Sequence, residues 1–414
     1  MPCKQLFFAS VVLFVLLSFP LINSVGASSE MWNQVYGGSG SDFAHSLVET
    51  SDGGLAVAGC TDSFGAGGAD FLLIKTDEYG TMEWNRTYGG IGGDFAHSLV
   101  ETSDGGFALA GVTDSFGAGG NDFWLIKTDS FGNVEWNQTY GGTDSSIAYS
   151  LVETFDGGFA LAGSSGSPLY FPIGSGTTDF WLVKTDAYGN MEWNQTYGGT
   201  GDEVAYSLVE TSDGGFALAG EQSRNFWLVK TDAYGNTEWN QTYGEAKYNH
   251  AYSVVEPADG GFVLASTNFQ LIKTDAHGTV EWNWTYGRED YDTVYSLVET
   301  FDGGFALAGE TYSFDDGNGF WLVKTDANGN LEWNQTYRRT EYDRPYSLIQ
   351  TSDGGYALAG DTINLGSTYL WVVKTNENGI IPEFPSLTPM LSVIITIAIV
   401  LVVYKRKLSK LPAN

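Results

Sequence analysis

Cysteine is nearly absent from the sequence, with only Cys3 and Cys60. Cys3 precedes an apolar run, Leu6 to Phe19, that ends in small residues, a pattern typical of a secretory signal. We therefore expect residues 1–26 to be a signal peptide that is removed on export. One cysteine would then remain, which excludes an intramolecular disulfide.

Basic residues are also scarce. Lys and Arg number 19 against 50 Asp and Glu, which gives a formal net charge of −31. A surface this acidic repels phosphate backbones, so nucleic acid is not an expected partner. Histidine occurs only four times, and the G-x-S-x-G, H-E-x-x-H and Cys/His metal-binding patterns are all missing. No catalytic residue and no cofactor is predicted from these motifs.

A second long apolar run lies near the other end of the chain. Residues from Phe384 to Tyr404 carry no charge and are followed at once by a basic cluster. Such a run is long enough to cross a bilayer as a helix, and the basic cluster indicates the cytoplasmic side. We expect a protein of the cell membrane with a single span and an extracellular ectodomain: a linker over 379–386, a transmembrane helix over 387–404 and a basic cytoplasmic tail over 405–414.

Internal repetition is the strongest feature of the sequence. Asp-Gly-Gly, Lys-Thr-Asp (once Lys-Thr-Asn) and Trp-Asn each occur seven times. In the repeat 96–140, "AHSLVET" and "FALAG" predict two strands around a tight turn, and "DFWLIKT" and "VEWNQTY" predict two more. Four antiparallel strands in a unit of this size are typical of a propeller blade. We name these strands A, B, C and D, from the centre outward.

The last repeat lacks its D strand, and a spare copy, "MWNQVY", stands before the first repeat at Met31 to Tyr36. If the spare strand completes the last blade, the ring closes and the free edges that an open array would expose are removed. The sequence therefore predicts an all-β protein, a seven-bladed β-propeller over 30–378 closed by its N-terminal strand. The expected blades are 43–88, 96–140, 148–197, 205–243, 250–286, 294–337, and 345–376 with 31–36.

This pattern resembles the β-propeller repeats of secreted and cell-surface proteins. The Trp near the last strand of each repeat is similar to the docking tryptophan of quinoprotein-like propellers. The chain departs from the quinone-dependent dehydrogenases in its blade number and in lacking an adjacent cysteine pair, so a quinone cofactor is not expected. "IPEFPS" at Ile381 to Ser386 resembles the Pro-Glu-Phe sorting signals of archaeal surface proteins. That resemblance implies that the span is cut off after export and replaced by a lipid.

One face of the ring varies more than the other. The A–B and C–D turns are nearly constant, whereas the B–C and D–A connections, which emerge on the same face, differ widely. Variable loops on a rigid scaffold are typical binding elements. Three D–A connections concentrate Arg, Lys and Tyr beside acidic groups and predict a site for an extracellular glycan or protein. The candidate ligand-binding residues are Lys247, Tyr248, His250, Arg288, Tyr291, Asp292, Arg338, Arg339, Tyr342, Asp343 and Arg344.

Two other interpretations of this face stay open. The charged loops could be a solvated rim with local ion pairs. The chain could also be an extracellular enzyme that acts on polysaccharide through acidic residues of this face. His45 and His97 occupy the A-strand position that holds Tyr in the other five repeats, so we interpret them as packing residues. On the constant face, the Lys that ends each C strand is expected to pair with the Glu that ends the A strand.

Two further kinds of site are suggested by local motifs. Gly-rich B–C loops place Asp62 with Asp70, and Asp114 with Asp122, at their ends, which makes these residues candidate calcium ligands. Each of six D strands carries an N-x-T sequon, which predicts a belt of glycans on the outermost strands. The candidate glycosylation sites are Asn85, Asn137, Asn194, Asn240, Asn283 and Asn334.

Overall fold

The computed structural model describes residues 31–166, 178–244, 250–287, 292–312, 319–340, 342–364 and 366–381. Every regular element in these ranges is a β-strand, and none of these residues forms a helix that could cross a membrane. The predicted signal peptide, transmembrane helix and basic tail lie outside the described residues. The same holds for all of the linker beyond residue 381.

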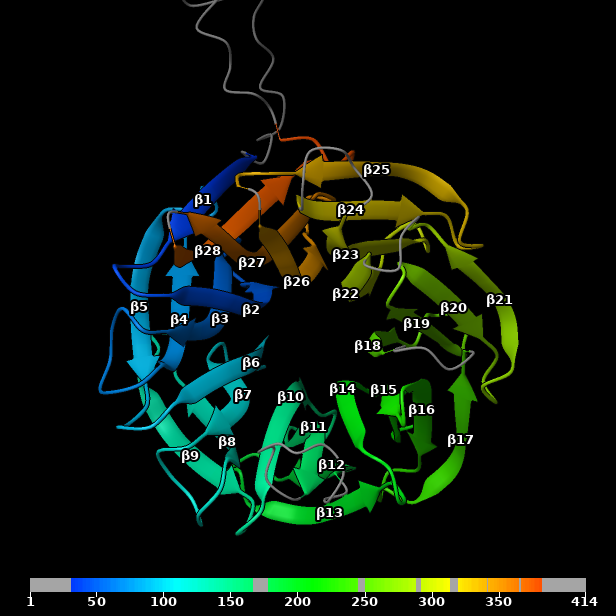
Figure 1. The fold of residues 1–414 in the computed structure, drawn as a ribbon, viewed down its shortest axis with the longest axis horizontal. Helices are drawn as coiled ribbons and strands as arrows, with labels where there is room; N and C mark the ends of the chain where they lie inside the picture. Colours follow the sequence, from blue (N-terminus) through cyan, green and yellow to red (C-terminus); the bar gives the residue numbers. More distant parts are fainter. Residues whose placement is uncertain are drawn as a thin grey trace, which may run out of the picture. The chain divides into compact units, whose positions relative to one another are not determined.

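The strands form seven separate four-stranded antiparallel sheets around a common axis (Figure 1). Blade 1 consists of β2 (Asp42–Glu49), β3 (Leu55–Thr61), β4 (Asp70–Thr76) and β5 (Met82–Tyr88). Blade 2 consists of β6 (Asp94–Glu101), β7 (Phe107–Thr113), β8 (Asp122–Thr128) and β9 (Val134–Tyr140). Blade 3 consists of β10 (Ser145–Glu153), β11 (Phe159–Gly166), β12 (Thr178–Thr185) and β13 (Met191–Tyr197). Blade 4 consists of β14 (Glu203–Glu210), β15 (Phe216–Gln222), β16 (Asn225–Thr231) and β17 (Thr237–Tyr243). Blade 5 consists of β18 (Ala251–Val255), β19 (Phe262–Ser266), β20 (Gln270–Thr274) and β21 (Val280–Thr285). Blade 6 consists of β22 (Thr293–Glu299), β23 (Phe305–Thr311), β24 (Gly319–Thr325) and β25 (Leu331–Tyr337).

Blade 7 confirms the predicted closure. It combines β26 (Asp343–Gln350), β27 (Tyr356–Asn364) and β28 (Ser367–Thr375) with β1 (Trp32–Tyr36), in the order β1-β28-β27-β26. The pairing of β1 with β28 runs antiparallel from Trp32 opposite Lys374 to Tyr36 opposite Leu370. The chain is therefore an all-β seven-bladed propeller in which the first strand supplies the outermost strand of the last blade.

Each A–B turn depends on its two glycines. In blade 1, Gly53 has φ of 86° and donates its backbone N–H to the Thr50 carbonyl at 2.8 Å. The Asp52 carboxylate accepts hydrogen bonds from the Thr50 hydroxyl and the Gly54 N–H, which fixes the turn. A Cβ on Gly54 would lie 2.0 Å from the Thr76 carbonyl oxygen, so no larger residue fits there. The motif thus specifies both the turn and the approach of strand C.

Neighbouring blades are joined by the tryptophan predicted to be a docking residue. Trp32 of blade 7 packs over Gly80 in the C–D turn of blade 1, and a Cβ on that glycine would lie 2.6 Å from the indole. The Tyr36 hydroxyl donates a hydrogen bond to the Gly80 carbonyl at 2.6 Å. The same contacts recur in the six other blades, from Trp84 with Tyr88 onward. One pair of aromatic residues per repeat therefore connects the whole ring.

Two polar contacts also repeat between blades. The Leu99 N–H donates to the Ser46 hydroxyl of the preceding blade at 3.1 Å, and the series returns to blade 7, where the Leu47 N–H donates to Ser347. The Glu101 carboxylate accepts from the Ser51 backbone N–H in the A–B turn of the preceding blade. These bonds satisfy backbone donors that turns otherwise leave unpaired.

The predicted pairing of the C-strand Lys with the A-strand Glu is wrong. Lys75 instead contacts Asp52 of the A–B turn at 2.9 Å and Glu83 of strand D at 3.0 Å. Equivalent three-residue groups recur in blades 2 to 6. The A-strand Glu is not available because it bonds to the A–B turn of the preceding blade.

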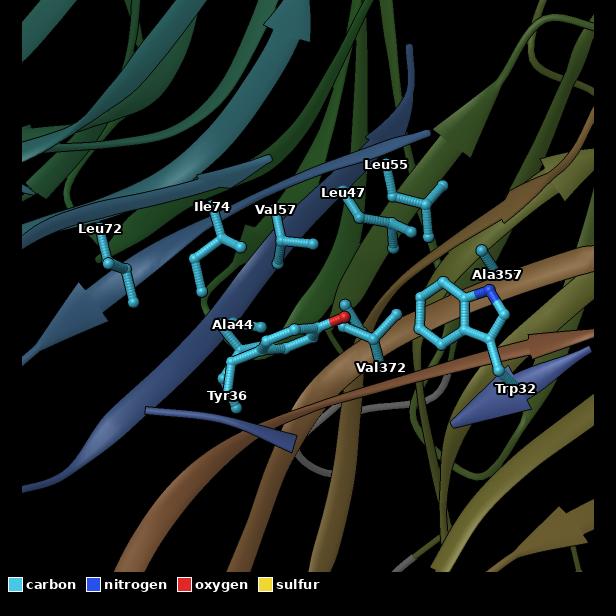
Figure 2. Packing of buried hydrophobic residues seen from close by; sticks show 12 residues of the cluster. Trp32, Tyr36, Ala44, Leu47, Leu55, Val57, Leu72, Ile74, Ala357 and Val372 are labelled. Carbon is cyan, nitrogen blue, oxygen red and sulfur yellow. The ribbon is translucent and has the colours of Figure 1, made fainter. Parts of the chain in front are cut away.

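The hydrophobic core is divided into seven clusters, each between two adjacent sheets. Figure 2 shows the cluster that joins blade 7 to blade 1, where Trp32 and Tyr36 of β1 lie with Leu47, Val57 and Ile74. Burial of this apolar surface is the largest favourable contribution to the fold. Strand β1 therefore connects two blades as well as completing one.

Candidate functional site

A closed ring of seven aromatic side chains surrounds the axis, one from each A strand. The centroids of neighbouring rings lie between 5.1 and 5.5 Å apart all the way round. These distances fit tilted and edge-to-face aromatic contacts. The members of this aromatic ring are His45, His97, Tyr149, Tyr206, Tyr252, Tyr295 and Tyr346.

A β-bulge places each of these side chains at the axis. In blade 1, Ala44 is opposite Gly59 and Ser46 is opposite Ala58, so His45 is the extra residue of strand A. The same register shift occurs in the six other A–B pairs. A bulge re-aims the side chain of the extra residue, and seven of them produce a repeated aromatic layer. His45 and His97 are thus packing residues, as interpreted from the sequence.

The histidines of this ring are held in their neutral form. Burial lowers the pKa of His45, and burial together with the neighbouring His45 lowers the pKa of His97 to about 3. The His45 Nδ1 atom lies 2.8 Å from the Ala96 carbonyl oxygen, which is consistent with a neutral imidazole that donates from Nδ1. The aromatic ring therefore carries no charge near pH 7.

Two positions per blade lie next to this ring, toward the face of the B–C and D–A connections, and we call the residues at these positions the channel wall. One is the A-strand residue two positions before the ring residue: Phe43, Phe95, Ile147, Val204, His250, Thr293 and Arg344 in blades 1 to 7. The other follows the small residue that ends "FALAG" in strand B: Cys60, Val112, Ser164, Glu221, Thr267, Glu310 and Asp361. In six blades these two residues are opposite each other in the β-sheet register.

The wall is asymmetric. Blades 1 to 3 supply a mostly apolar sector, and blades 4 to 7 supply a polar sector that contains all the carboxyl, imidazole and guanidinium side chains of the two sets. We define the polar sector by these five residues: Glu221, His250, Glu310, Arg344 and Asp361. Because the rest of the repeat is nearly constant, this difference is a departure from the scaffold and marks a candidate binding site.

Within the polar sector, a basic side chain of strand A contacts the B-strand carboxylate of the preceding blade. His250 Nδ1 of blade 5 lies 2.6 Å from Glu221 Oε2 of blade 4. Arg344 Nε of blade 7 donates to Glu310 Oε2 of blade 6 at 3.0 Å. Burial opposes the charge of Arg344, but the Glu310 carboxylate raises the pKa of this guanidinium above its ordinary value.

The aromatic ring is hydrogen-bonded to the same carboxylates. The Tyr295 hydroxyl donates to Glu310 Oε1 at 2.7 Å, and the Tyr206 hydroxyl lies 3.5 Å from Glu221 Oε1. Burial and the adjacent carboxylate raise the pKa of both tyrosines. Tyr206 and Tyr295 therefore stay protonated and act as donors.

Asp361 differs from the other two carboxylates of the sector. Its side chain is 3% exposed, and its Oδ1 atom has no hydrogen-bond partner among the described residues. Burial raises the pKa of Asp361 to about 6, against the opposing effects of the Arg344 charge and a hydrogen bond with Tyr346. A buried carboxylate oxygen without a donor is costly, which makes Asp361 the least satisfied carboxylate of the site.

A pocket of about 380 Å³ opens beside Glu221 and His250. Its other lining residues are Asp202 in a D–A connection and Ser223 and Arg224 in the B–C turn of blade 4. Ser223 and Arg224 have φ of 50° and 73°, which side chains other than glycine adopt only at a cost of about 1 kcal/mol each. The pocket has the size of a small-molecule site and is lined by both signs of charge.

The structure brings two of the predicted ligand-binding residues, His250 and Arg344, to the channel wall. Asp292 and Asp343 are fully buried and bond to backbone N–H groups of their own blades, from Tyr312 and from Arg339 respectively. Arg339 and Tyr342 are exposed, and Arg338 is half-buried. Lys247, Tyr248, Arg288 and Tyr291 lie outside the described residues.

The candidate calcium ligands take structural contacts. Asp70 Oδ2 accepts the Ala66 N–H at 2.6 Å and Asp122 Oδ2 accepts the Ala118 N–H at 2.8 Å, while Asp62 and Asp114 are exposed. In the described ranges, no three Asp, Glu, His or Cys side chains are grouped so that they could hold a metal ion.

The candidate glycosylation sites are all exposed on their D strands. In blade 2, the Asn137 Oδ1 atom accepts a hydrogen bond from Trp124 Nε1 at 3.2 Å, and blades 3, 4 and 6 repeat this contact. Because indole nitrogen only donates, the amide oxygen must face the Trp. The Nδ2 atom of Asn137, to which an N-linked glycan would attach, is then directed away from the indole, whereas Asn194 Nδ2 also donates to the Met191 sulfur at 3.2 Å.

Sequence reasoning missed Glu221, Glu310 and Asp361. The signal was present, because these residues follow "FALAG" or "YALAG" at a position where blades 1 and 2 have Cys and Val. Comparison of the repeats was applied to the loops, where differences are large, and not to single positions within strand B. Such a site is indicated where the residue at one strand position differs between blades while the rest of that strand stays the same.

No protein-family model matches the chain. The regulatory protein FlaEY of Caulobacter vibrioides is 28% identical over 186 residues, which are 42% of this chain and 19% of that protein. Among solved structures, BamB from Moraxella catarrhalis has a TM-score of 0.45 at 12% identity and covers 79% of this chain and 85% of its own. Sqt1 from Chaetomium thermophilum has a TM-score of 0.49 at 11% identity, with 84% and 99% coverage. The extracellular domain of BT4673 from B. thetaiotaomicron has a TM-score of 0.49 at 12% identity, with 84% and 43% coverage.

Proposed function

We propose that this protein is a recognition module of the cell surface that binds an extracellular glycan or protein at the channel wall of blades 4 to 7. One observation carries the proposal: the repeat is nearly constant everywhere except on one face, and there the inward positions change from apolar to charged over part of the ring. A scaffold gains nothing from such a change, because buried charges cost solvation energy. A ligand that meets these groups would explain it.

The exported, anchored topology belongs to the same proposal. The predicted signal peptide, the apolar span and the basic tail support an extracellular propeller held at the membrane, with or without replacement of the span by a lipid. The resemblance of "IPEFPS" to archaeal sorting signals supports the same placement. Mass spectrometry of the protein isolated from its native membrane would show whether residues beyond 386 are retained.

Binding can be tested with the purified full-length chain on an array of cell-surface glycans and against purified surface proteins. Glu221→Gln and Arg344→Ala each remove one ion pair of the polar sector, and we expect a rise of about tenfold or more in Kd for the true ligand. Tyr188→Ala is the matched control, because Tyr188 is 73% exposed in a C–D turn on the constant face. Equal binding by all three variants would place the ligand elsewhere.

A second candidate function is cleavage of polysaccharide. It is favoured by the presence of two carboxyl groups near each other, Asp361 and Glu310, of which Asp361 has a pKa raised to about 6 by burial and is therefore suited to act as an acid. Release of reducing ends from polysaccharides by the wild type, lost in Asp361→Asn, would establish this activity. Against it stands the occupation of Glu310 by Arg344 and Tyr295.

A further inference from the structure

The pairing rule of the polar sector is broken at one interface. A basic side chain of strand A meets the carboxylate of the preceding blade between blades 4 and 5, as His250 with Glu221, and between blades 6 and 7, as Arg344 with Glu310. The third carboxylate, Asp361 of blade 7, faces blade 1. There the equivalent A-strand residue is Phe43, which cannot supply a charge or a donor.

The surroundings of Asp361 suit an organic cation. The Arg344 guanidinium bonds to Glu310, so it is shared rather than dedicated to Asp361. The Asp361 Oδ1 atom has no hydrogen-bond partner within the described ranges. Tyr346 lies on the same wall, and its ring is 5.5 Å from neutral His45. A carboxylate next to aromatic faces is the combination that binds ammonium groups through an ion pair and cation–π contacts.

We propose that Asp361 receives a primary ammonium group of the ligand, at the place where the blade 7–blade 1 interface lacks its own cation. This inference rests on the proposed function and names the chemistry of its ligand. A primary ammonium is a compact charge with three donors, so it can donate to the unpaired Oδ1 atom of Asp361. An amino sugar and a lysine side chain of a partner protein both offer this group.

Isothermal titration calorimetry on the full-length chain separates these sources. The probes are glucosamine and Nα-acetyl-lysine amide, each with its neutral N-acetylated counterpart. We expect millimolar binding of amine probes and none of the acetylated ones, with the tighter amine identifying the source. Asp361→Asn should raise Kd about tenfold or more. The matched control is Asp122→Asn, which changes another buried carboxylate with an unpaired Oδ1 atom, at the start of strand C and not in the channel wall.

Phe43→Arg provides a second, independent test. It places a basic residue where blades 5 and 7 already have one, so the new guanidinium should pair with Asp361, abolish amine binding and raise Tm. In the double variant Phe43→Arg with Asp361→Asn, the gain in Tm should disappear. A Phe43→Arg variant that binds amines like the wild type, or whose Tm does not depend on Asp361, would contradict the proposal.

The pH dependence of binding gives a third readout. The groups that face Asp361 are Arg344 and Tyr346 from β26, Glu310 from β23, and Cys60 and His45 from blade 1. Burial lowers the pKa of His45 and raises the pKa of the Cys60 thiol to about 12, so both side chains favour their neutral forms. Amine affinity should therefore fall as pH decreases through about 6, where Asp361 takes up a proton. Constant affinity from pH 8 to 5 would reject the assignment.

The two proposals fail in different ways. If a glycan or protein from the array binds wild type and Asp361→Asn equally, recognition stands and the ammonium site is rejected. If amine probes bind but no surface ligand is found, the ammonium site stands without the wider function. If amine probes bind wild type and Asp361→Asn alike, or do not bind at about 100 mM, Asp361 is not a receptor.

Discussion

Replacement of Trp32 by Ala tests whether strand β1 closes the ring. The Trp32 side chain is 8% exposed, packs over Gly80 of blade 1 and donates from Nε1 to the Glu78 carbonyl at 3.0 Å. Truncation of a buried Trp costs about 4 kcal/mol, and the lost hydrogen bond adds about 1 kcal/mol. At about 2 °C per kcal/mol for a domain of this size, we expect Tm to fall by about 10 °C.

The matched variant is Trp136→Ala in blade 2. Trp136 makes the same contact with the glycine of the next blade, Gly189. Its strand β9, however, follows the other three strands of its own blade directly in the sequence, whereas β1 is far in the sequence from the rest of blade 7. Calorimetry should show the larger loss for Trp32→Ala, and hydrogen exchange should speed up at the amides of β1 and β28. Equal Tm values for the two variants, with unchanged exchange in β28, would refute the closure mechanism.

Three further outcomes are expected. Five aspartates of the A–B turns have pKa values lowered to about 2, because hydrogen bonds from Thr and Lys outweigh the effect of burial: Asp52, Asp104, Asp156, Asp213 and Asp302. Their ionised forms stabilise the fold above about pH 4, and denaturant titrations should show that this stability is lost as pH falls from about 4 to 2. His97 has a folded pKa of about 3, below its unfolded value of about 6.5, so acid destabilises the fold through it, and His97→Tyr should reduce the loss of stability between pH 6.5 and 4. Intact mass of native protein should exceed the sequence mass by whole glycans, and Asn137→Gln should remove one glycan; a mass that matches the unmodified chain would reject the glycan belt.

The fold could be predicted from the sequence because its determinants are local and repeated. Asp52, Gly53 and Gly54 specify a turn by themselves, and the spare strand before the first repeat matched the strand missing from the last. Exact strand ends were harder, as β10 begins at Ser145 and not at 148. Strand ends depend on contacts with neighbouring loops, which a repeat pattern does not show.

The site could be predicted only in part, because it depends on which blades meet. His250 and Arg344 were recognised as candidates from their loops, but their partners Glu221 and Glu310 come from the preceding blades. The same cause explains the wrong pairing of Lys75: sequence spacing suggested a partner in strand A, whereas that Glu bonds to the neighbouring blade. Contacts across a blade boundary require the register of the whole ring.

The position of β28 within blade 7 has a mechanical consequence. In the six other blades the last strand of the repeat lies at the edge of its sheet, but β28 lies between β1 and β27 and is hydrogen-bonded on both sides. A pulling force applied at Thr375 would therefore load two ladders of hydrogen bonds together. Strand β28, the last strand of the described propeller, is therefore held against extraction more strongly than a last strand that lies at a sheet edge.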